Sequence, residues 1–483
     1  MASLFLHLIF LTLLLVLSQA AGIGHGPPSL YISSANNDSI LPADKIELNA
    51  TDFSDLLEQS ANNELLEHNE LAEQFSQNES QEEANATAET TLTLPNQLLN
   101  AHKTDSLLVQ PLASRKGGGL DSRKENERQK MITEGGGTAQ SEQAVANALR
   151  WLAKHQLADG SWRLQFAEHE PCNGQCRHQG LSEHDTGATA LALYAFLGSG
   201  QTHQEGQYKK AIENGLNYLL KQKRTATNTE NSHKILSDFR GVGDMYSHGL
   251  ATIVLCEIYT MTGDSKYKEP AQEAINYIVY TQNPNDGGWR YTPRQPGDMT
   301  VTGWQIMALR SGQMAGMSIP PETLKRAEQF LDKMETEKGA YYGYIKPDKL
   351  PGPTSIGLLN RMYFGIARED PQLKKGVDYL VDLGPSPNDI YFNFYTTQIL
   401  RHQGGPQWEA WNEKMREYLI RTQASRGHES GSWYFEGDQH NEAGGRLYCT
   451  AMSAMILEVY YRYAPLYQKS AVPEEPFILR DSK

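Results

Sequence analysis

The chain has 483 residues, a net charge of −14 at pH 7 and an isoelectric point near 5.5. This acidic balance argues against a nucleic-acid partner, because proteins that bind phosphate backbones carry a basic face. The 4 cysteines are too few for a disulfide scaffold, so a chain of this length is expected to fold on a hydrophobic core.

Residues 1–20 contain an apolar run from Leu4 to Leu17, followed by small residues around Ser18 and Ala20. This pattern predicts an export signal, and it is short for a bilayer span of ~20 apolar residues. We therefore expect an exported protein, in the periplasm, the cell envelope or the extracellular space. An uncleaved membrane anchor is the alternative, and no later segment is apolar enough to span a membrane.

Residues 21–140 are poor in aromatic residues and rich in Asn, Glu, Gln and Ser. Such a segment cannot bury enough apolar surface to offset its chain entropy. We expect a disordered acidic linker here and a short C-terminal tail at residues 468–483.

Residues 141–467 alternate between segments of helical periodicity and clusters of turn residues. The pattern predicts twelve helices in six pairs: 142–156 with 185–198, 206–222 with 247–262, 267–282 with 299–315, 320–335 with 354–367, 371–383 with 389–403, and 407–423 with 446–463.

The two helices of each pair differ in character. The first is amphipathic, as in AIENGLNYLLKQ, whereas the second is apolar or small on nearly every side, as in TGATALALYAFLG. A helix without a polar face is buried all round. We therefore expect an all-α fold, an (α/α)6 toroid with outer and inner helices. An open solenoid is the alternative, but it would need polar capping repeats, and none is evident.

A corner of similar sequence recurs three times between a first and a second helix: HQLADGSW, TQNPNDGGW and TQASRGHESGSW, ending at Trp162, Trp289 and Trp433. The Gln amide can satisfy backbone groups at a helix end, the Gly permits a tight turn, and the Trp can seal the corner.

These corners resemble the QW motifs of terpene cyclases and protein prenyltransferases, the prenyltransferase and squalene oxidase repeat class. Runs such as GGWRYTPRQPGDMTVTGWQIMALRSGQMAG and GGRLYCTAMSAMILEVYYRYAPLY are most similar to an exported bacterial subgroup of that class without an established reaction. The resemblance covers roughly residues 141–467 and implies a toroid more firmly than an activity.

If the inner helices run parallel, their first residues meet at one end of the ring. There the sequence is unusually polar, and a polar collar around a cavity is a default site hypothesis. The catalytic candidates are Asp298, His248, Asp185 and Tyr246, although Asp185 and Asp298 suit helix caps equally well. The ligand-binding candidates are Tyr391, Asn393, Tyr395, Arg446 and Tyr448.

The resemblance does not carry the chemistry of the two enzyme classes. The acid of class II terpene cyclases is a DxDD motif, whereas this chain has no two adjacent Asp residues and Asp298 is followed by Met299 and Thr300. Protein prenyltransferases use a zinc ion held by Asp, Cys and His. The corresponding thiolate is absent near Asp298, and Cys449 is expected to be a small buried residue.

A second cluster lies in HEPCNGQCRHQG, which contains His169, Cys172, Cys176 and His178. Zinc is one interpretation of this spacing. For an exported protein we favour a disulfide between Cys172 and Cys176, and we expect no metal and no cofactor.

Other toroids act on carbohydrates. A lyase could use Tyr246, His248, Asn393 and Arg446, and a hydrolase would need two carboxylates, for which Asp185 and Asp298 are the obvious pair. The sequence thus favours a toroid that binds an apolar (isoprenoid) or polysaccharide ligand or a partner. An enzyme, either an unconventional isoprenoid cyclase or a polysaccharide-acting toroid, is the alternative, and the oligomeric state is left undefined.

Overall fold

The computed structural model describes residues 120–228, 234–464 and 466–467, which belong to one compact unit, Leu98–Lys483. The predicted export signal, most of the predicted linker and the predicted C-terminal tail lie outside the described residues.

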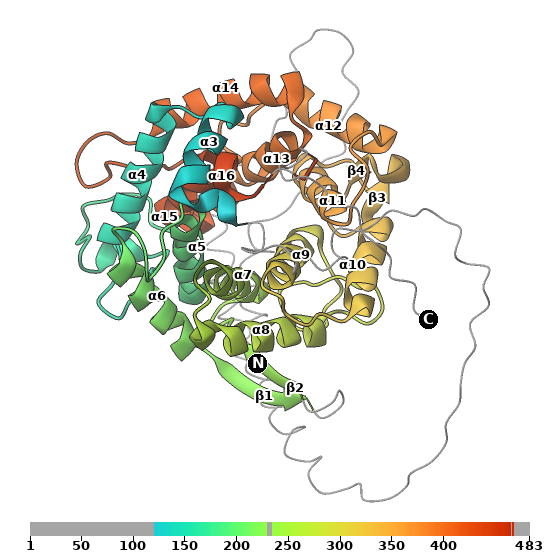
Figure 1. Cartoon of the computed structure of the whole chain (residues 1–483), viewed down its shortest axis with the longest axis horizontal. Helices are drawn as coiled ribbons and strands as arrows, with labels where there is room; N and C mark the ends of the chain where they lie inside the picture. The colour runs from blue at the N-terminus through green and yellow to red at the C-terminus, as the bar shows by residue number, and fades with distance from the viewer. Residues whose placement is uncertain (1–119, 229–233, 465, 468–483) are drawn as a thin grey trace, which may run out of the picture. The chain divides into compact units, whose positions relative to one another are not determined.

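Twelve helices of the described part form two concentric layers (Figure 1). The outer layer consists of α4 (Ala139–Lys154), α6 (Lys209–Lys221), α8 (Lys268–Thr281), α10 (Pro321–Met334), α12 (Pro371–Leu383) and α14 (Gly405–Thr422). The inner layer consists of α5 (Asp185–Gly198), α7 (Met245–Thr262), α9 (Met299–Met314), α11 (Pro351–Tyr363), α13 (Ile390–Gln403) and α15 (Gln439–Leu457).

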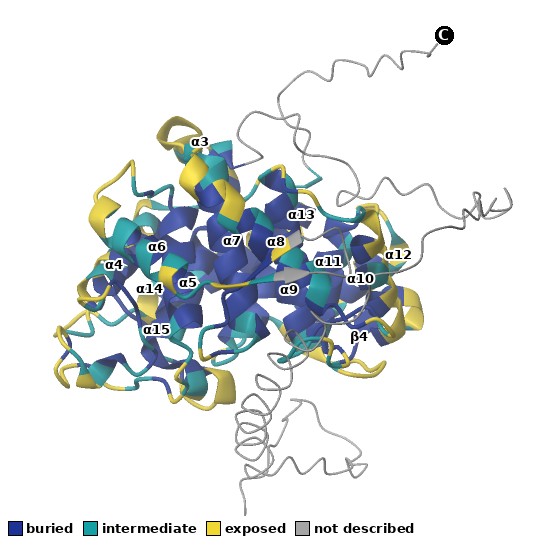
Figure 2. Ribbon diagram, turned by 90° about the horizontal axis from the view of Figure 1, so that it is seen from below, coloured by how far each residue is buried: buried dark blue, intermediate teal, exposed yellow. Residues whose placement is uncertain are grey.

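The two layers follow from the apolar pattern of the sequence. Every residue of α5 after Asp185 is buried, whereas α6 buries only Ile212, Gly215, Leu216 and Leu219, which share one helical face. Figure 2 shows the buried inner helices and the exposed periphery.

The inner helices close into a ring. Each packs against the next, from α5 through α7, α9, α11 and α13 to α15, and α15 packs against α5. Their first residues lie at the same end: the Met245 amide donates to Tyr291 just before α9, and the Met299 amide donates to Tyr344 just before α11. The predicted all-α (α/α)6 toroid is therefore confirmed.

The three corners share one geometry. The Gln156, Gln282 and Gln423 amides each donate to the carbonyl of their corner glycine and to the next outer helix, at Ala211, Thr323 and Ala144. The three Trp indoles donate to the carbonyls of Leu152, Ile278 and Leu419 at 2.7–2.8 Å. Each corner thus fastens its hairpin to the following one.

The opposite end of the ring is covered by residues from both ends of the described chain. These are η3 (Asp121–Arg123), α3 (Glu125–Gly135) and α16 (Val459–Arg462), with α3 packed on α16 (Figures 1 and 2). The predicted disordered linker is therefore wrong over residues 120–140, because tertiary contacts stabilise a helix that its sequence does not favour.

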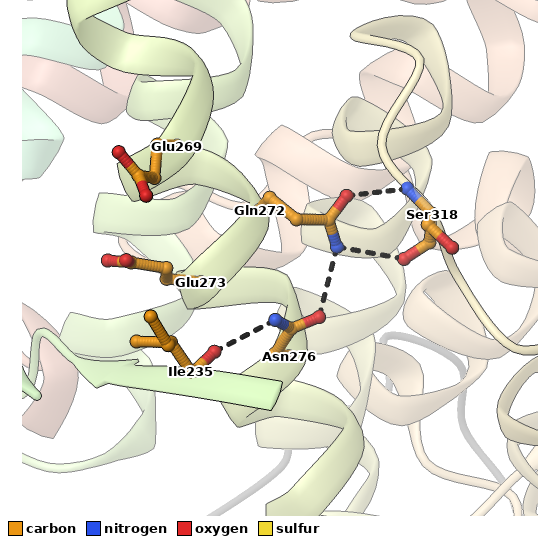
Figure 3. A pocket seen from close by; sticks show the side chains of 6 residues that line it. All are labelled: Ile235, Glu269, Gln272, Glu273, Asn276 and Ser318. Atoms are coloured by element: carbon orange, nitrogen blue, oxygen red, sulfur yellow. Dashed lines mark hydrogen bonds between the residues drawn. The ribbon is translucent and has the colours of Figure 1, made fainter. Parts of the chain in front are cut away.

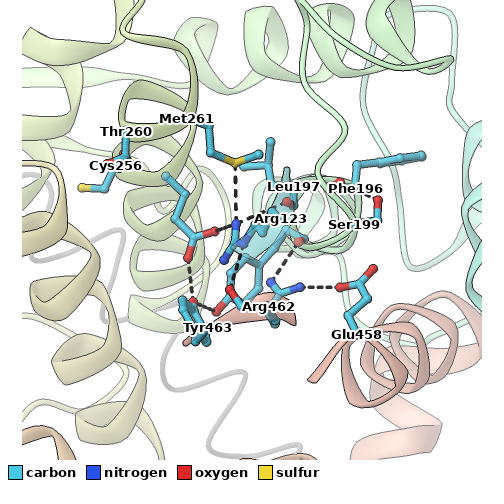
Figure 4. A network of polar contacts seen from close by, with 12 residues as sticks. Arg123, Phe196, Leu197, Ser199, Cys256, Thr260, Met261, Glu458, Arg462 and Tyr463 are labelled. Atoms are coloured by element: carbon cyan, nitrogen blue, oxygen red, sulfur yellow. Dashed lines mark hydrogen bonds and ion pairs between the residues drawn. The ribbon is translucent and has the colours of Figure 1, made fainter. Parts of the chain in front are cut away.

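A buried polar network anchors this cover (Figure 4). Arg123 pairs with Glu257 of α7 at 2.7 Å and donates to the carbonyl of Arg462 at 2.9 Å. Arg462 pairs with Glu458 at 2.5 Å and stacks on Tyr194 of α5. The charges are paired inside the protein, where an isolated charge would be costly.

Short strands and single helical turns lie in the loops between the helices of the ring. The hairpin of β1 (Arg224–Asn228) and β2 (Lys234–Asp238) packs on α8, and β3 (Glu335–Thr336) pairs with β4 (Tyr341–Tyr342). Single turns of 3-10 helix occur at η4 (Phe166–Glu168), η5 (Ser265–Tyr267) and η6 (Glu337–Gly339). Within the described ranges, no helix is both long and apolar enough to cross a bilayer.

Candidate functional site

Aromatic side chains gather at the end of the ring where the inner helices begin. We call this set the aromatic collar; it comprises Tyr246 of α7, Trp304 of α9, Tyr391 and Tyr395 of α13, Tyr448 of α15, and Tyr291 and Tyr344 from the loops before α9 and α11. Five of the seven side chains (Tyr246, Tyr291, Tyr344, Tyr391 and Tyr448) are only half-buried.

The rings meet across the interior of the toroid. Trp304 on α9 lies 6.5 Å from Tyr391, 6.1 Å from Tyr395 and 5.8 Å from Phe394, centroid to centroid. All three partners are on α13, which is separated from α9 in the ring by α11. The collar therefore lines a shared interior and is not a row along one helix.

Most collar hydroxyls are bound within the protein. The Tyr246 hydroxyl donates to Thr300 at 2.6 Å, the Tyr291 and Tyr344 hydroxyls lie 2.8 Å apart, and those of Tyr391 and Tyr395 lie 3.5 Å apart. The Tyr448 hydroxyl is buried and has no hydrogen-bond partner. Burial raises the pKa of Tyr246 and Tyr448 well above the usual value, so both are neutral hydroxyls.

A fully buried carboxyl, that of Asp298, adjoins the collar. Asp298 caps α9: its Oδ1 accepts hydrogen bonds from the amides of Thr300 and Val301 and from the Thr300 hydroxyl, at 2.7–2.9 Å. Its Oδ2 is buried without a hydrogen bond, 3.7 Å from Arg290 Nε. Burial raises the pKa of Asp298 to about 6, although the hydrogen bonds and Arg290 oppose this shift.

A chain of hydrogen bonds connects this carboxyl to the collar. Tyr246 donates to Thr300, and Thr300 donates to Asp298. Arg290 lies over the rings of Tyr291 and Tyr344, at 5.4 and 6.0 Å from their centroids. The sequence-based candidates Tyr246, Asp298, Tyr391, Tyr395 and Tyr448 are thus placed together.

His248 and Asn393 belong to the frame of the toroid. His248 Nδ1 accepts from the Phe239 amide, and its Nε2 donates to the carbonyl of Ala274 on the outer helix α8. Burial lowers the pKa of His248 to about 4, so the ring is neutral. Asn393 bonds both the amide and the carbonyl of Ser386. Neither fits the collar role that the sequence suggested.

Asp185 and Arg446 also have partners away from the collar. Asp185 Oδ2 lies 3.2 Å from Arg163 Nε. Arg446 pairs with Glu429 at 3.1 Å and donates to the carbonyl of Arg177 and to the Ser432 hydroxyl. The expected collar role of both, and the pairing of Asp185 with Asp298 as two catalytic carboxylates, find no support in these contacts.

The two loop cysteines lie in a different cluster. Cys172 and Cys176 are both free, so the expected disulfide is not formed in the structure. Their sulfur atoms and ring nitrogens of His155 and His428 all lie within 4.8 Å of one another. The spacing in the sequence had suggested His169 and His178 as partners of the cysteines instead. His178 stacks on Tyr434, and neither belongs to the cluster.

An open pocket on the outer wall lies between α8 and its neighbours (Figure 3). Its walls satisfy one another: Gln272 exchanges hydrogen bonds with the backbone of Ser318, and Asn276 donates to the carbonyl of Ile235. Glu273 is held by Lys223 and Ser237. With its polar groups so engaged, the pocket offers few groups for a ligand.

No protein-family model matches the chain, and no curated protein matches it. Among solved structures, the type II terpene cyclase MstE from Scytonema is similar at 15% identity, over 68% of this chain and 98% of that one, with a TM-score of 0.45. An α-1,6-mannanase of Salegentibacter is similar at 11% identity, over 66% and 98%, with a TM-score of 0.45. A D-mannose isomerase is similar at 11% identity, over 67% and 96%, with a TM-score of 0.44.

Proposed function

We propose that the protein binds an apolar ligand of the isoprenoid class against the aromatic collar. The observation that carries this proposal is the convergence of aromatic rings, five of them half-buried, from four inner helices and two loops at one end of the ring. Aromatic faces provide a large apolar surface at low entropic cost.

The engaged hydroxyls favour an apolar ligand over a saccharide. A saccharide needs several free donors and acceptors around it. Trp304 has no hydroxyl, and five of the six collar tyrosines already use their hydroxyls in hydrogen bonds within the protein, such as Tyr246 to Thr300 and Tyr291 to Tyr344. The unpartnered hydroxyl of Tyr448 suits a single polar end group.

The test is to purify the full chain from its host and analyse solvent extracts by mass spectrometry, and then to measure binding of a fluorescent polyprenol. We expect a polyprenoid to co-purify and the affinity to fall about 10-fold in Trp304→Ala, because an anchoring aromatic residue contributes ~1.4 kcal/mol or more. Tyr280→Ala on the outer helix α8, whose ring contacts Arg294, is the matched control. Retention of an oligosaccharide without any lipid would refute the proposal.

A second function is favoured by one observation, the chain from Tyr246 through Thr300 to Asp298. An acid with a pKa near 6 is partly protonated at neutral pH, so it could donate its proton to a carbon of a bound polyene, and the carboxylate left behind could then remove a proton from the resulting carbocation. The enzyme would then be an isoprenoid cyclase-like isomerase. Incubation with linear polyprenoids should yield products of unchanged mass and altered retention, and Asp298→Asn should abolish them. A saccharide product would instead indicate the polysaccharide-acting alternative.

We also propose that the toroid acts outside the cytosol, because the apolar run Leu4–Leu17 has the form of an export signal. Expression in the native host followed by fractionation and N-terminal sequencing tests this. A mature chain that starts near residue 21 outside the cytosol supports export, and an uncleaved chain in the membrane fraction supports the anchor.

A further inference from the structure

We propose that Cys172, Cys176, His155 and His428 bind a structural zinc ion that locks the last hairpin of the toroid to the first. The four residues come from three places in the chain. His155 ends α4, the two cysteines lie in the loop before α5, and His428 lies in the corner between α14 and α15.

The distances fit one tetrahedral ion. Cys176 Sγ lies 3.4 Å from His155 Nε2 and 3.2 Å from His428 Nδ1, and Cys172 Sγ lies 3.9 Å from His428 Nδ1. Zinc–sulfur and zinc–nitrogen bonds of about 2.3 and 2.0 Å place the ligand atoms of a tetrahedron about 3.3–3.8 Å apart. Two thiolates and two imidazoles are a donor set that selects zinc over calcium or magnesium.

The surroundings orient His155 for coordination. His155 Nδ1 lies 2.7 Å from the carbonyl of Trp151, which places the proton on Nδ1 and directs the Nε2 lone pair to the thiols. The His155 ring also stacks on Trp151 at 3.9 Å, so its orientation is fixed.

Three of the four side chains of the site are buried. Cys172, Cys176 and His155 are 1%, 4% and 1% exposed, and His428 is half-buried. Four protein ligands leave no open position, which is typical of a structural and not of a catalytic zinc.

A disulfide accounts for the cluster less well. It would join two residues of one loop and leave the inward nitrogens of His155 and His428 facing sulfur atoms that no longer carry a proton. The neighbouring contacts instead bridge the same two hairpins as the cluster. Arg177 pairs with Glu429, and the Arg446 amide donates to the carbonyl of His178.

The test measures metal in the full chain, purified without chelator and without an added histidine tag. We expect about one zinc ion per chain by inductively coupled plasma mass spectrometry, and a fall to background in Cys176→Ser and His428→Ala. Cys449→Ser, which removes a buried thiol outside the cluster, is the matched control and should keep the ion.

The wild-type chain gives two readouts that do not depend on the folding of the variants. Cobalt(II) substitution should produce the charge-transfer and d–d absorption of tetrahedral thiolate ligation. Removal of zinc by chelator should accelerate amide exchange in loops 165–182 and 424–432, but not in the cluster-free corner 283–297. A metal-free chain with four free thiols, or an intact mass lower by two hydrogens from a Cys172–Cys176 disulfide, would overturn the proposal.

Discussion

The side-chain amide of Gln423, just after the last outer helix, donates a 2.8 Å hydrogen bond to the carbonyl of Ala144 on the first outer helix. Gln156 and Gln282 make the equivalent bond to the outer helix that follows them in the chain. The bond from Gln423 therefore closes the ring with the same contact that joins successive hairpins within it.

The backbone of a corner glycine lies so close to the next outer helix that an alanine side chain would not fit there. Gly287 has φ +85°, and a Cβ there would lie 2.1 Å from the carbonyl oxygen of Arg326. Gly316 has φ +71° and open space around it. We expect Gly316→Ala to cost about 1 kcal/mol for the left-handed backbone alone, whereas Gly287→Ala should cost about 1–3 kcal/mol more because of overpacking.

Urea unfolding of both variants measures the difference in the free energy of unfolding. Equal losses in Gly287→Ala and Gly316→Ala would mean that the corner backbone yields to the added methyl group, and that close packing of successive hairpins is not required.

The cover of the ring depends on a buried charge pair. Arg123→Met should destabilise the protein by about 3–5 kcal/mol, because it leaves Glu257 buried without its partner; the two side chains are 1% and 0% exposed. Lys124→Ala is the control, since its pair with Asp121 is exposed and exposed pairs contribute at most ~1 kcal/mol.

Chemical denaturation of Arg123→Met/Glu257→Gln completes this experiment. The double variant should regain a large part of the loss, because the uncompensated charge is removed. A double variant no more stable than Arg123→Met would show that the loss comes from packing and not from the buried charge.

Helix periodicity recovered the architecture from the sequence. The predicted bounds 185–198 and 371–383 match α5 and α12, which have uninterrupted patterns. The predicted start of the last inner helix, residue 446, also agrees with the structure, because the backbone of α15 leaves the helical conformation at Gly445, with φ +64° and ψ −165°. The residues from Gln439 to Gly444 form a separate short segment that Asp438 caps.

The direction of individual side chains was harder to predict. Two residues further along a helix is a rotation of about 200°, so His248 points to α8 while Tyr246 points to the collar. The same rotation separates Asn393 from Tyr391, whereas Tyr395, four residues on, shares the face of Tyr391. A list of helix-starting residues therefore mixes both faces.

Two pairs of site residues, Tyr291 with Tyr344 and His155 with His428, occupy recurring positions in the sequence. Tyr291 follows the corner residue Trp289 by two positions, and Tyr344 follows Tyr342, a buried aromatic residue between α10 and α11, by two positions. His155 and His428 occur in the first and third corners, but a contact between residues 273 positions apart depends on ring closure, which local patterns do not reveal.

The buried His248 should make stability depend on pH. Burial lowers its pKa from 6.5 to about 4, with Asp238 opposing and Arg240 assisting this shift. In the unfolded chain the His248 ring therefore binds a proton below about pH 6.5, whereas in the folded chain it stays neutral down to about pH 4. The free energy of unfolding consequently decreases as the pH falls from about 6.5 to 4. The full penalty is about 3 kcal/mol.

His248→Gln should remove this contribution. Its urea-unfolding free energy should be lower than that of the wild type at pH 8, because hydrogen bonds to Phe239 and Ala274 are altered, and the difference should shrink at pH 4.5. Polyprenol binding by the folded variant should be unchanged, since His248 lies outside the collar. A lower affinity for the polyprenol with unchanged stability would show instead that His248 contributes to the binding site.

Ligand affinity should also depend on pH through Asp298. Its pKa of about 6 is raised from 3.8, so the carboxyl carries charge mainly above pH 6. An apolar ligand in the collar excludes water and disfavours that charge, which raises the pKa further on binding. A further rise of one unit would make the affinity at pH 8 about 10-fold lower than at pH 5.

Asp298→Asn keeps the cap of α9 and removes the charge, so its affinity should be independent of pH and equal to the wild-type value at pH 5. Asp244→Asn, the corresponding cap of α7, should keep the wild-type profile. Fluorescence titrations with a polyprenol from pH 5 to 8 measure the dissociation constants, and a pH profile that persists in Asp298→Asn would assign the titration to another group.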